Sequence, residues 1–190
     1  MKLSPQQILF FQNKLAYIRD EESYKKLFYH FYPPLVSFCT TILSSKEDAQ
    51  DVVSESLLKI WSMGKELNYV ENLTLYIYKI AKNKCYDMLR KKKREPTAGE
   101  YTENASEYVP DETNPEQLYI ENELETHIAN AVHALPSQSQ LVYRLIKEQG
   151  FSYKQVTEIL GISLNTAETH MRLALKKIRM SLSAYLSGKK

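Results

Sequence analysis

The sequence predicts an all-α protein made of two small helical domains joined by a flexible acidic linker, with a helix-turn-helix in the second domain. Three observations support this prediction. Apolar residues recur at helical spacing almost throughout the 190 residues, without a clear alternating strand pattern. A segment rich in acidic residues and proline separates two helical stretches. Near the C-terminus, a glycine and a capping serine divide two apolar-periodic segments.

The first domain is expected to cover residues 1–94 and to begin with two helices. Ser4-Pro5-Gln6-Gln7 is typical of a capping box with proline at the first helical position, so a helix should run from there towards Tyr17. A second helical zone spans about 21–43. We expect the Pro33-Pro34 pair to disturb it, because proline lacks the N–H that an inner helical turn needs.

Two further helices complete the predicted first domain. Ser45 is a candidate N-cap for a helix from Lys46 to Met63, and Gly64 is a natural stop after it. Another helix should begin near Thr74 and end in the basic cluster 90–94.

The linker is expected at 95–115 and the second domain at 116–190. The second domain should contain a helix from about 116 to 134, a break at Pro136, and a helix that ends before Gly150. A short helix over 152–160 and a last helix from Leu164 should follow.

Composition excludes several function classes. The five glycines are too scattered for a G-x-G-x-x-G or Walker-type phosphate loop. Cys39 and Cys85 stand far apart, so there is no CxxC metal or redox pair, and a disulfide framework is not expected. No run approaches the roughly 18 apolar residues that span a membrane. We therefore expect a cytoplasmic protein without membrane insertion.

Charge is distributed unevenly, although the net charge is only +2. Eight basic residues and one acid lie between 79 and 94, and six basic residues and one acid lie between 164 and 190. Between 95 and 117 there are seven acids and no Lys or Arg. Two basic zones suggest a polyanion that is bound at two places. The acidic strip either serves solubility alone or mimics a nucleic acid in a basic channel of a partner.

Residues 151–170 have the layout of a helix-turn-helix. Gly161 permits a tight left-handed turn after the short helix, and Ser163 caps the next one. One face of that helix carries amide, hydroxyl and guanidinium groups, which suit base edges and phosphates. A plain amphipathic helix with a solvated face is the alternative. The polar face holds Asn165, Thr166, Thr169, Arg172 and Lys176, with His170 at its flank. The apolar stripe is expected to hold Leu164, Ala167, Met171, Ala174, Leu175 and Ile178.

A second candidate surface lies on the helix from Thr74 to Arg94. On a helical wheel, two aromatics, an amide and two cations fall within about 80° of one another. Unpaired bases stack on aromatic rings while cations hold the phosphates, so this stripe is typical of single-stranded nucleic-acid binding. Tyrosines that merely cover neighbouring side chains are the alternative. The stripe consists of Tyr76, Lys79, Asn83, Tyr86 and Arg90.

Three carboxylates form a third candidate surface on the helix that begins at Lys46. Asp48, Asp51 and Glu55 follow one face at i, i+3 and i+7. Docking onto a basic partner, a solvated acidic face and a divalent-metal site all fit this pattern. No His or Glu-x-x-His partner accompanies the carboxylates, so we expect no metal and no cofactor.

The segment from Asp48 to Trp61 resembles region 2.2 of the sigma-70 family, which docks on the RNA polymerase clamp. The segment from Tyr76 to Lys92 is similar to regions 2.3 and 2.4, which melt the promoter −10 element and capture its non-template strand. Leu135-Pro136 and the helix-turn-helix resemble region 4, which reads the −35 element. With only regions 2 and 4 and a short linker, the chain resembles the extracytoplasmic-function (ECF) type of sigma factor.

The resemblance implies a role for each candidate surface. The acidic face would contact polymerase core, the tyrosine stripe with Lys82 and the loop from Asn68 to Leu73 would bind melted −10 DNA, and the last helix would bind −35 duplex DNA. Core-contact candidates are Asp48, Asp51 and Glu55. Candidates for the −10 element are Tyr76, Lys79, Lys82, Asn83, Tyr86 and Arg90. Candidates for the −35 element are Asn165, Thr166, Glu168, Thr169, His170, Arg172 and Lys176.

The expected function is therefore that of a sigma factor, which is not an enzyme and has no catalytic residues. Its partners would be the clamp and flap regions of polymerase core and promoter DNA, both double- and single-stranded, with an anti-sigma factor as a further partner. A stand-alone helix-turn-helix regulator is the alternative function. A metal-dependent nuclease that uses Asp48, Asp51 and Glu55 is a third hypothesis.

Overall fold

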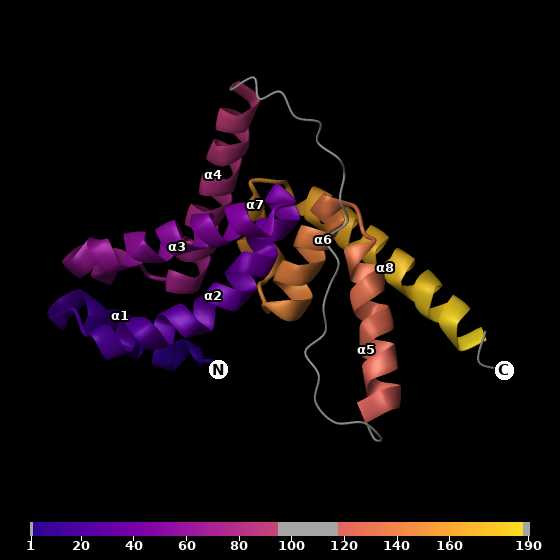
Figure 1. Cartoon of the computed structure of the whole chain (residues 1–190), viewed down its shortest axis with the longest axis horizontal. Coiled ribbons are helices and arrows are strands. Elements are labelled where there is room, and N and C mark those ends of the chain that lie inside the picture. The colour runs from indigo at the N-terminus through magenta and orange to yellow at the C-terminus, as the bar shows by residue number, and fades with distance from the viewer. Residues whose placement is uncertain (1, 95–117, 188–190) are drawn as a thin grey trace. The chain divides into compact units, whose positions relative to one another are not determined.

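The computed structural model describes residues 2–94 and 118–187. Within these residues the chain forms eight α-helices and no strand (Figure 1). The predicted all-α class is confirmed. Two compact units are present, one built on α1–α4 and one built on α5, α6 and α8. The predicted linker at 95–115 lies outside the described residues, so its boundaries stay a prediction.

Side-chain caps begin the first two helices, α1 (Pro5–Ile18) and α2 (Glu21–Leu43). Ser4 and Gln7 form the predicted capping box. Asp20 caps α2, where hydrogen bonds from the hydroxyl and the backbone N–H of Ser23 lower the pKa of its carboxyl. Each chain reversal between helices 1, 2 and 3 uses a residue with positive φ, Arg19 and Ser44 respectively.

The expected interruption at Pro33-Pro34 is wrong, because α2 continues through both prolines. Each proline removes one backbone donor but keeps a helical φ. The apolar face of α2 is buried on both sides of the pair, from Leu27 and Phe31 to Leu35 and Phe38. Burial of this face offsets the lost hydrogen bonds, so tertiary packing outweighs local propensity here.

The third and fourth helices begin and end close to their predicted positions. In α3 (Lys46–Met63), the Ser45 hydroxyl accepts the N–H of Asp48 at 3.2 Å, and Gly64 follows with φ of 53°. A 3-10 segment, η1 (Gly64–Tyr69), then leads to α4 (Leu73–Arg94). Asn72 caps α4 by accepting the N–H of Leu75 at 2.9 Å. Figure 1 shows the C-terminal half of α4 projecting beyond α1–α3.

The core of the first unit lies between α2, α3 and α4. Phe38 meets the ring of Tyr78 edge-on, with the ring centroids 5.2 Å apart. Cys39 and Cys85 are both free and buried, and their thiols are hydrogen-bonded to each other. This hydrogen bond and burial raise the pKa of Cys39 far above its ordinary value. Side chains that share this core include Leu57, Ile60, Ile77 and Ala81.

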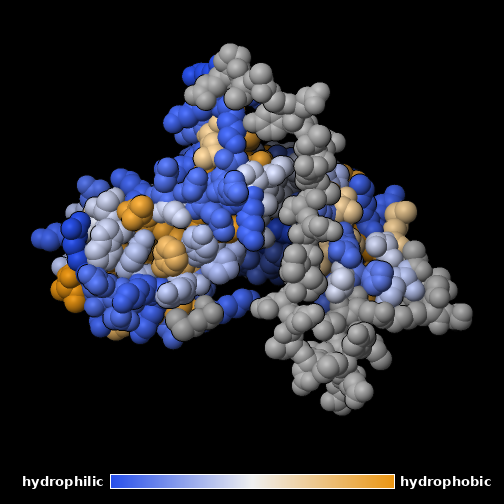
Figure 2. Space-filling model, viewed as in Figure 1, coloured by the Kyte–Doolittle hydropathy of each residue, from blue (hydrophilic) through white to orange (hydrophobic). Residues whose placement is uncertain are grey.

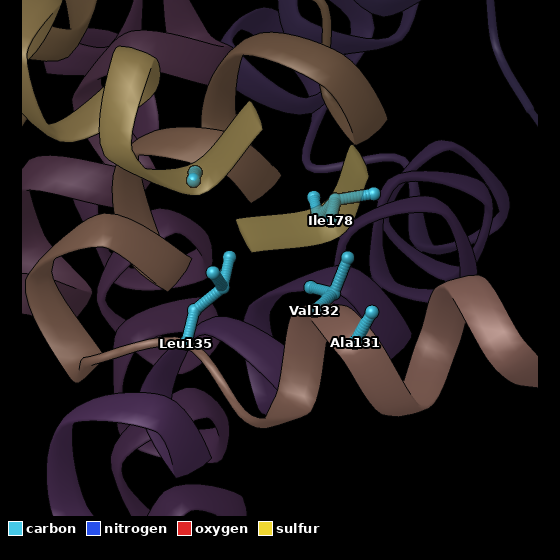
Figure 3. Close-up of a cluster of buried hydrophobic side chains, with 5 residues drawn as sticks. Ala131, Val132, Leu135 and Ile178 are labelled. Carbon is cyan, nitrogen blue, oxygen red and sulfur yellow. The ribbon is translucent and has the colours of Figure 1, made fainter. Parts of the chain in front are cut away.

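The second unit pairs the last helix with two shorter ones. It contains α5 (Leu118–His133), α6 (Ser137–Tyr143), a π-helical turn η2 (Arg144–Glu148) and α8 (Leu164–Ser187). The short helix α7 (Tyr153–Leu160) lies between η2 and α8 in the sequence, and its residues up to Thr157 belong to this unit. Both α5 and α6 pack on α8. Figure 3 shows Ala131 and Val132 of α5, and Leu135 just after this helix, in one hydrophobic cluster with Ile178 of α8, which Ala174 completes.

The buried stripe of α8 is narrower than its apolar stripe. Ala167, Met171, Ala174 and Ile178 are buried. Leu164 and Leu175, at one edge of the apolar stripe, are 52% and 40% exposed. The buried residues follow one another at spacings of three and four, which is the line along which a partner helix contacts a straight helix.

No helix in the described part of the chain is both long enough and apolar enough to cross a membrane.

Candidate nucleic-acid interface

The predicted stripe on α4 is accessible to solvent, and the opposite side of the helix is buried. Asn83 and Arg90 are exposed, and Tyr76 and Tyr86 are half-buried. On the other side, Ile77, Ala81 and Cys85 are buried, and Ile80 and Met88 are half-buried. The helix therefore presents its aromatic and polar residues outward. The stripe is Tyr76, Lys79, Lys82, Asn83, Tyr86 and Arg90, and from here on we call it the α4 stripe.

Two contacts along the helix organise the α4 stripe. The Nζ of Lys82 lies 5.2 Å from the ring centroid of Tyr86, close enough for a cation–π interaction. Arg90 forms an ion pair with Asp87 one turn before it. The Tyr86 ring thus keeps one face beside a cation, whereas the charge of Arg90 is partly neutralised.

Basic residues continue from the α4 stripe to the end of the helix. Lys91, Lys92, Lys93 and Arg94 are exposed and occupy the last turn. In the space-filling view, hydrophilic residues cover most of the projecting end of α4 (Figure 2). Lys93 lies seven positions after Tyr86 and therefore on the same side of the helix. The helical wheel contains this information, but the sequence interpretation did not include Lys93.

The acidic face of α3 is partly paired with α4. Lys84 Nζ lies 2.5 Å from Glu55 Oε2, and Lys92 Nζ lies 2.5 Å from Asp48 Oδ2. Sequence reasoning missed both lysines as partners, because their contacts depend on how two helices pack. Asp51 is exposed and forms no ion pair within the described ranges. Of the three carboxylates, Asp51 is thus the one that remains open to a cation from outside.

The pKa of the Asp48 carboxyl is lowered despite its partial burial. Desolvation by burial acts to raise the pKa of its carboxyl. Hydrogen bonds from Lys92 and Ser45, together with the charge of Lys92, outweigh that effect, so the pKa is lowered. In residues 2–94 and 118–187, no group of three or more His, Cys, Asp or Glu side chains is arranged to hold a metal ion. The metal-dependent nuclease hypothesis therefore has no support in this part of the chain.

The helix-turn-helix has the predicted geometry. Ser152 and Gln155 form a capping box at the start of α7, which the sequence interpretation missed although the Ser-x-x-Gln pattern is present. Gly161 ends α7 in the left-handed conformation, with φ of 72° and ψ of 36°. The Ser163 hydroxyl then accepts the N–H of Thr166 at 3.1 Å and so caps α8.

The predicted −35 candidates on α8 differ in their exposure to solvent and in whether their side chains already have a hydrogen-bond partner. Asn165, Glu168, Arg172 and Lys176 are exposed, and Thr169 is half-buried. These five side chains can meet a partner directly.

Two other −35 candidates on α8 already have partners. The hydroxyl of Thr166 lies 2.8 Å from the Ser163 hydroxyl. A hydrogen bond of 3.2 Å joins His170 Nδ1 to Ser139 Oγ, which belongs to α6 and is 2% exposed. His170 therefore fastens α8 to α6 in addition to any contact that it makes outside.

Comparison with known families gives two matches, in the order in which the two units occur. The family described as Sigma-70 region 2 matches residues 27–95, and Sigma-70, region 4 matches residues 127–178. Together they cover more than half of the chain. The first match contains the acidic face and the α4 stripe, and the second contains the helix-turn-helix.

Individual relatives agree with these matches. The ECF RNA polymerase sigma factor RpoE of Cereibacter sphaeroides is 23% identical over 166 residues, which cover 87% of this chain and 89% of that protein. The ECF RNA polymerase sigma-E factor of Haemophilus influenzae is 26% identical over 153 residues, covering 77% and 81%.

A solved structure shows the same fold. The sigma factor RpoE from Bartonella quintana, in complex with the anti-sigma factor NepR, has a TM-score of 0.64 and 22% identity. The similarity covers 85% of this chain and 98% of that one. The chain thus belongs to the sigma-70 family of RNA polymerase sigma factors and is of the ECF type.

Proposed function

We propose that the chain directs RNA polymerase core to specific promoters by using three surfaces. Core polymerase binds the acidic face of α3, the α4 stripe binds the unpaired −10 strand, and the exposed face of α8 binds −35 duplex DNA. The chain supplies binding and no catalysis of its own, since a sigma factor is a DNA-binding initiation factor and not an enzyme.

One observation supports the proposal above all others. The chain carries two polar faces of different chemistry in an order that matches Sigma-70 regions 2 and 4. The α4 stripe combines aromatic rings with cations, which suits unpaired bases. The α8 face combines amide and hydroxyl groups with Arg172, which suits the major groove. A stand-alone helix-turn-helix regulator needs only the second face, so this alternative is not favoured.

The two faces suggest how promoter melting becomes favourable. Binding of α8 to duplex DNA would anchor the complex, and the α4 stripe would then stabilise each base that leaves the helix. Base–aromatic stacking is worth about 1–3 kcal/mol per base. This is comparable to the mean stacking energy of about 1.4 kcal/mol for one DNA base-pair step. A few such contacts therefore shift the equilibrium towards open DNA.

Run-off transcription tests the function directly. Core polymerase from the host would transcribe fragmented host genomic DNA with and without the protein. We expect discrete transcripts that require the protein and that fade at least about tenfold with Asp51→Arg. The reason is that this change places a cation where a cation of the clamp would bind, and like charges in contact cost several kcal/mol.

A matched variant separates this effect from a general change in charge. Glu66→Arg makes the same change in charge at an exposed carboxylate of η1, away from the acidic face of α3. Transcription should survive it. No transcripts but good duplex binding would support the stand-alone regulator. Equal loss with both variants would contradict the assignment of the α3 face to polymerase.

We propose further that polymerase binds through its clamp to the first unit and through its flap to the second, and that an anti-sigma factor is an additional partner. Family membership supports these partners. Affinity capture from the host with the intact chain, in competition with purified core polymerase, tests the anti-sigma partner. A protein that is displaced by core polymerase and that suppresses the run-off transcripts would meet the definition.

A further inference from the structure

Gln12 is a buried polar residue of α1 that holds a loop of the first unit. Its side chain is only 2% exposed. The Nε2 amide donates one hydrogen bond to the carbonyl of Leu67 at 2.9 Å and another to the carbonyl of Val70 at 2.7 Å. A primary amide carries two N–H donors on one nitrogen, so a single side chain satisfies both carbonyls. These bonds bridge 55 and 58 positions of the sequence.

The two carbonyls flank the tip of the loop. Leu67 is fully buried, and its carbonyl also accepts the N–H of Val70 at 3.2 Å. Between these two anchors lie Asn68, which is half-buried, and Tyr69, which is 87% exposed. On its other side the loop joins the cap of α4 at Asn72. The backbone is thus held at both ends, while one aromatic ring stands in solvent.

An exposed ring on a held backbone is suited to stacking. An apolar ring of this size in solvent gains free energy when it covers a flat partner, and an unpaired base is such a partner. A loop that must order itself on binding would lose part of that gain as conformational entropy. The hydrogen bonds of Gln12 keep this cost low, because the backbone around Tyr69 is ordered beforehand.

We infer that Gln12 is a positioning residue which presents Tyr69 to an unpaired base of melted promoter DNA. The resemblance to the sigma-70 family already implies that the loop from Asn68 to Leu73 binds melted −10 DNA, and the inference rests on this part of the proposed function. The inference adds Gln12 of α1, which lies before the region that matches Sigma-70 region 2. Gln12 acts only through the loop, and Tyr69 makes the contact.

A double-mutant cycle tests the link between the two residues. The variants are Gln12→Met, Tyr69→Ala and both together. Methionine keeps an unbranched side chain of similar length but removes both donors. The readout is permanganate reactivity of −10 thymines in holoenzyme complexes on a promoter recovered by run-off transcription. Binding of a −35 duplex by the same variants serves as the reference.

Coupling between the sites is the expected result. Loss of one stacked base should lower open-complex formation about tenfold for Tyr69→Ala. Tyr69→Phe should stay near the wild type, since the ring is kept. Gln12→Met should cost about fivefold, and the double variant should cost about as much as Tyr69→Ala alone. Independent sites would instead multiply to about fiftyfold. That product, or an unchanged Tyr69→Ala variant, would overturn the inference.

Hydrogen exchange on the intact chain separates positioning from loss of folding. Gln12→Met should speed amide exchange in residues 68–72 and leave α3 protected, whereas Gln6→Met, at an exposed glutamine of the same helix, should change neither. This assay needs no polymerase. Unchanged amide exchange in residues 68–72 of Gln12→Met would contradict the positioning role of Gln12. Absence of all protein-dependent transcripts would instead contradict the proposed function, and the exchange result would still decide whether Gln12 orders the loop.

Discussion

Asn83 and Tyr86 lie one turn apart on α4 and are the two residues of the α4 stripe from which we expect the largest contribution to the proposed melting step. Asn83 is exposed and can pair with a base edge, whereas Tyr86 offers a ring with Lys82 beside it. Arg90 lies on the same side but already pairs with Asp87, so we expect less from it than its charge suggests. The contacts of each side chain with its neighbours therefore distinguish residues by their expected contribution to DNA binding, whereas a helical wheel shows only that they share one side of the helix.

The variant Asn83→Ala with Tyr86→Ala should block open-complex formation and leave core binding intact. One lost stack and one lost base contact together should reduce the open complex at least about a hundredfold, at about 1.4 kcal/mol per tenfold. Permanganate reactivity at −10 measures melting, and co-elution with core polymerase measures binding. The exposed pair Asn13→Ala with Tyr17→Ala, on α1, is a matched control. Normal permanganate reactivity in the first variant would remove the α4 stripe from the melting step.

At the level of elements, hydrogen-bonded serine caps mark where α7 and α8 begin. The capping box of Ser152 and Gln155 satisfies backbone donors that the first turn of α7 would leave unpaired. Because α7 has only eight residues, it cannot rely on its own propensity. Its start therefore depends on the cap and on burial of Val156 and Ile159.

Ser152→Ala should lower the free energy of unfolding of the second unit by about 1 kcal/mol, the usual cost of losing a serine cap. Chemical denaturation followed by circular dichroism and by hydrogen exchange in α7 measures this change. Ser137→Ala offers a control, since Ser137 begins α6 without serving as its cap. An equal effect of both substitutions would mean that the capping box contributes nothing specific to α7.

At the level of the whole molecule, the acidic face of α3 and the exposed face of α8 are proposed to bind different partners, polymerase core and duplex DNA, so defects in these two surfaces should separate. Asp51 belongs to the acidic face of the first unit and Arg172 to the exposed face of α8 in the second. Loss of one surface should therefore leave the other able to bind its own partner. Transcription, which needs both, should fall in either case.

Arg172→Ala should weaken duplex binding and reduce its logarithmic salt dependence by about 1 if the guanidinium contacts a phosphate. Arg172→Ala should leave core binding unchanged. Asp51→Arg should weaken core binding and leave binding of the −35 duplex unchanged. Fluorescence anisotropy with a −35 duplex and co-elution with core polymerase measure the two activities. Loss of core binding in Arg172→Ala would show that the second unit contributes to the polymerase contact through this residue.

Local patterns predicted most of the fold. Helix starts at Ser4 and Ser45 and stops at Gly64 and Gly161 lie where the sequence placed them, because a cap depends on residues within one turn. The sequence did not predict that α2 is continuous. The cost of the backbone hydrogen bonds lost at its two prolines is offset by burial of its apolar face, and that burial depends on how other helices pack against it. The exposed faces of α4 and α8 followed from periodicity, which shows which side of a helix is polar.

The helical class, the main helix positions and the chemistry of the two polar faces were predictable from the residues alone, because these depend on spacing along one chain. The pairs of side chains that meet across elements became known only from the packed fold. These pairs are the ion pair of Lys92 with Asp48, the hydrogen bond between the free thiols of Cys39 and Cys85, and the hydrogen bond from Gln12 to the loop that carries Tyr69. Such pairs depend on how packed helices are rotated and shifted against one another, and periodicity specifies a face without naming its partner.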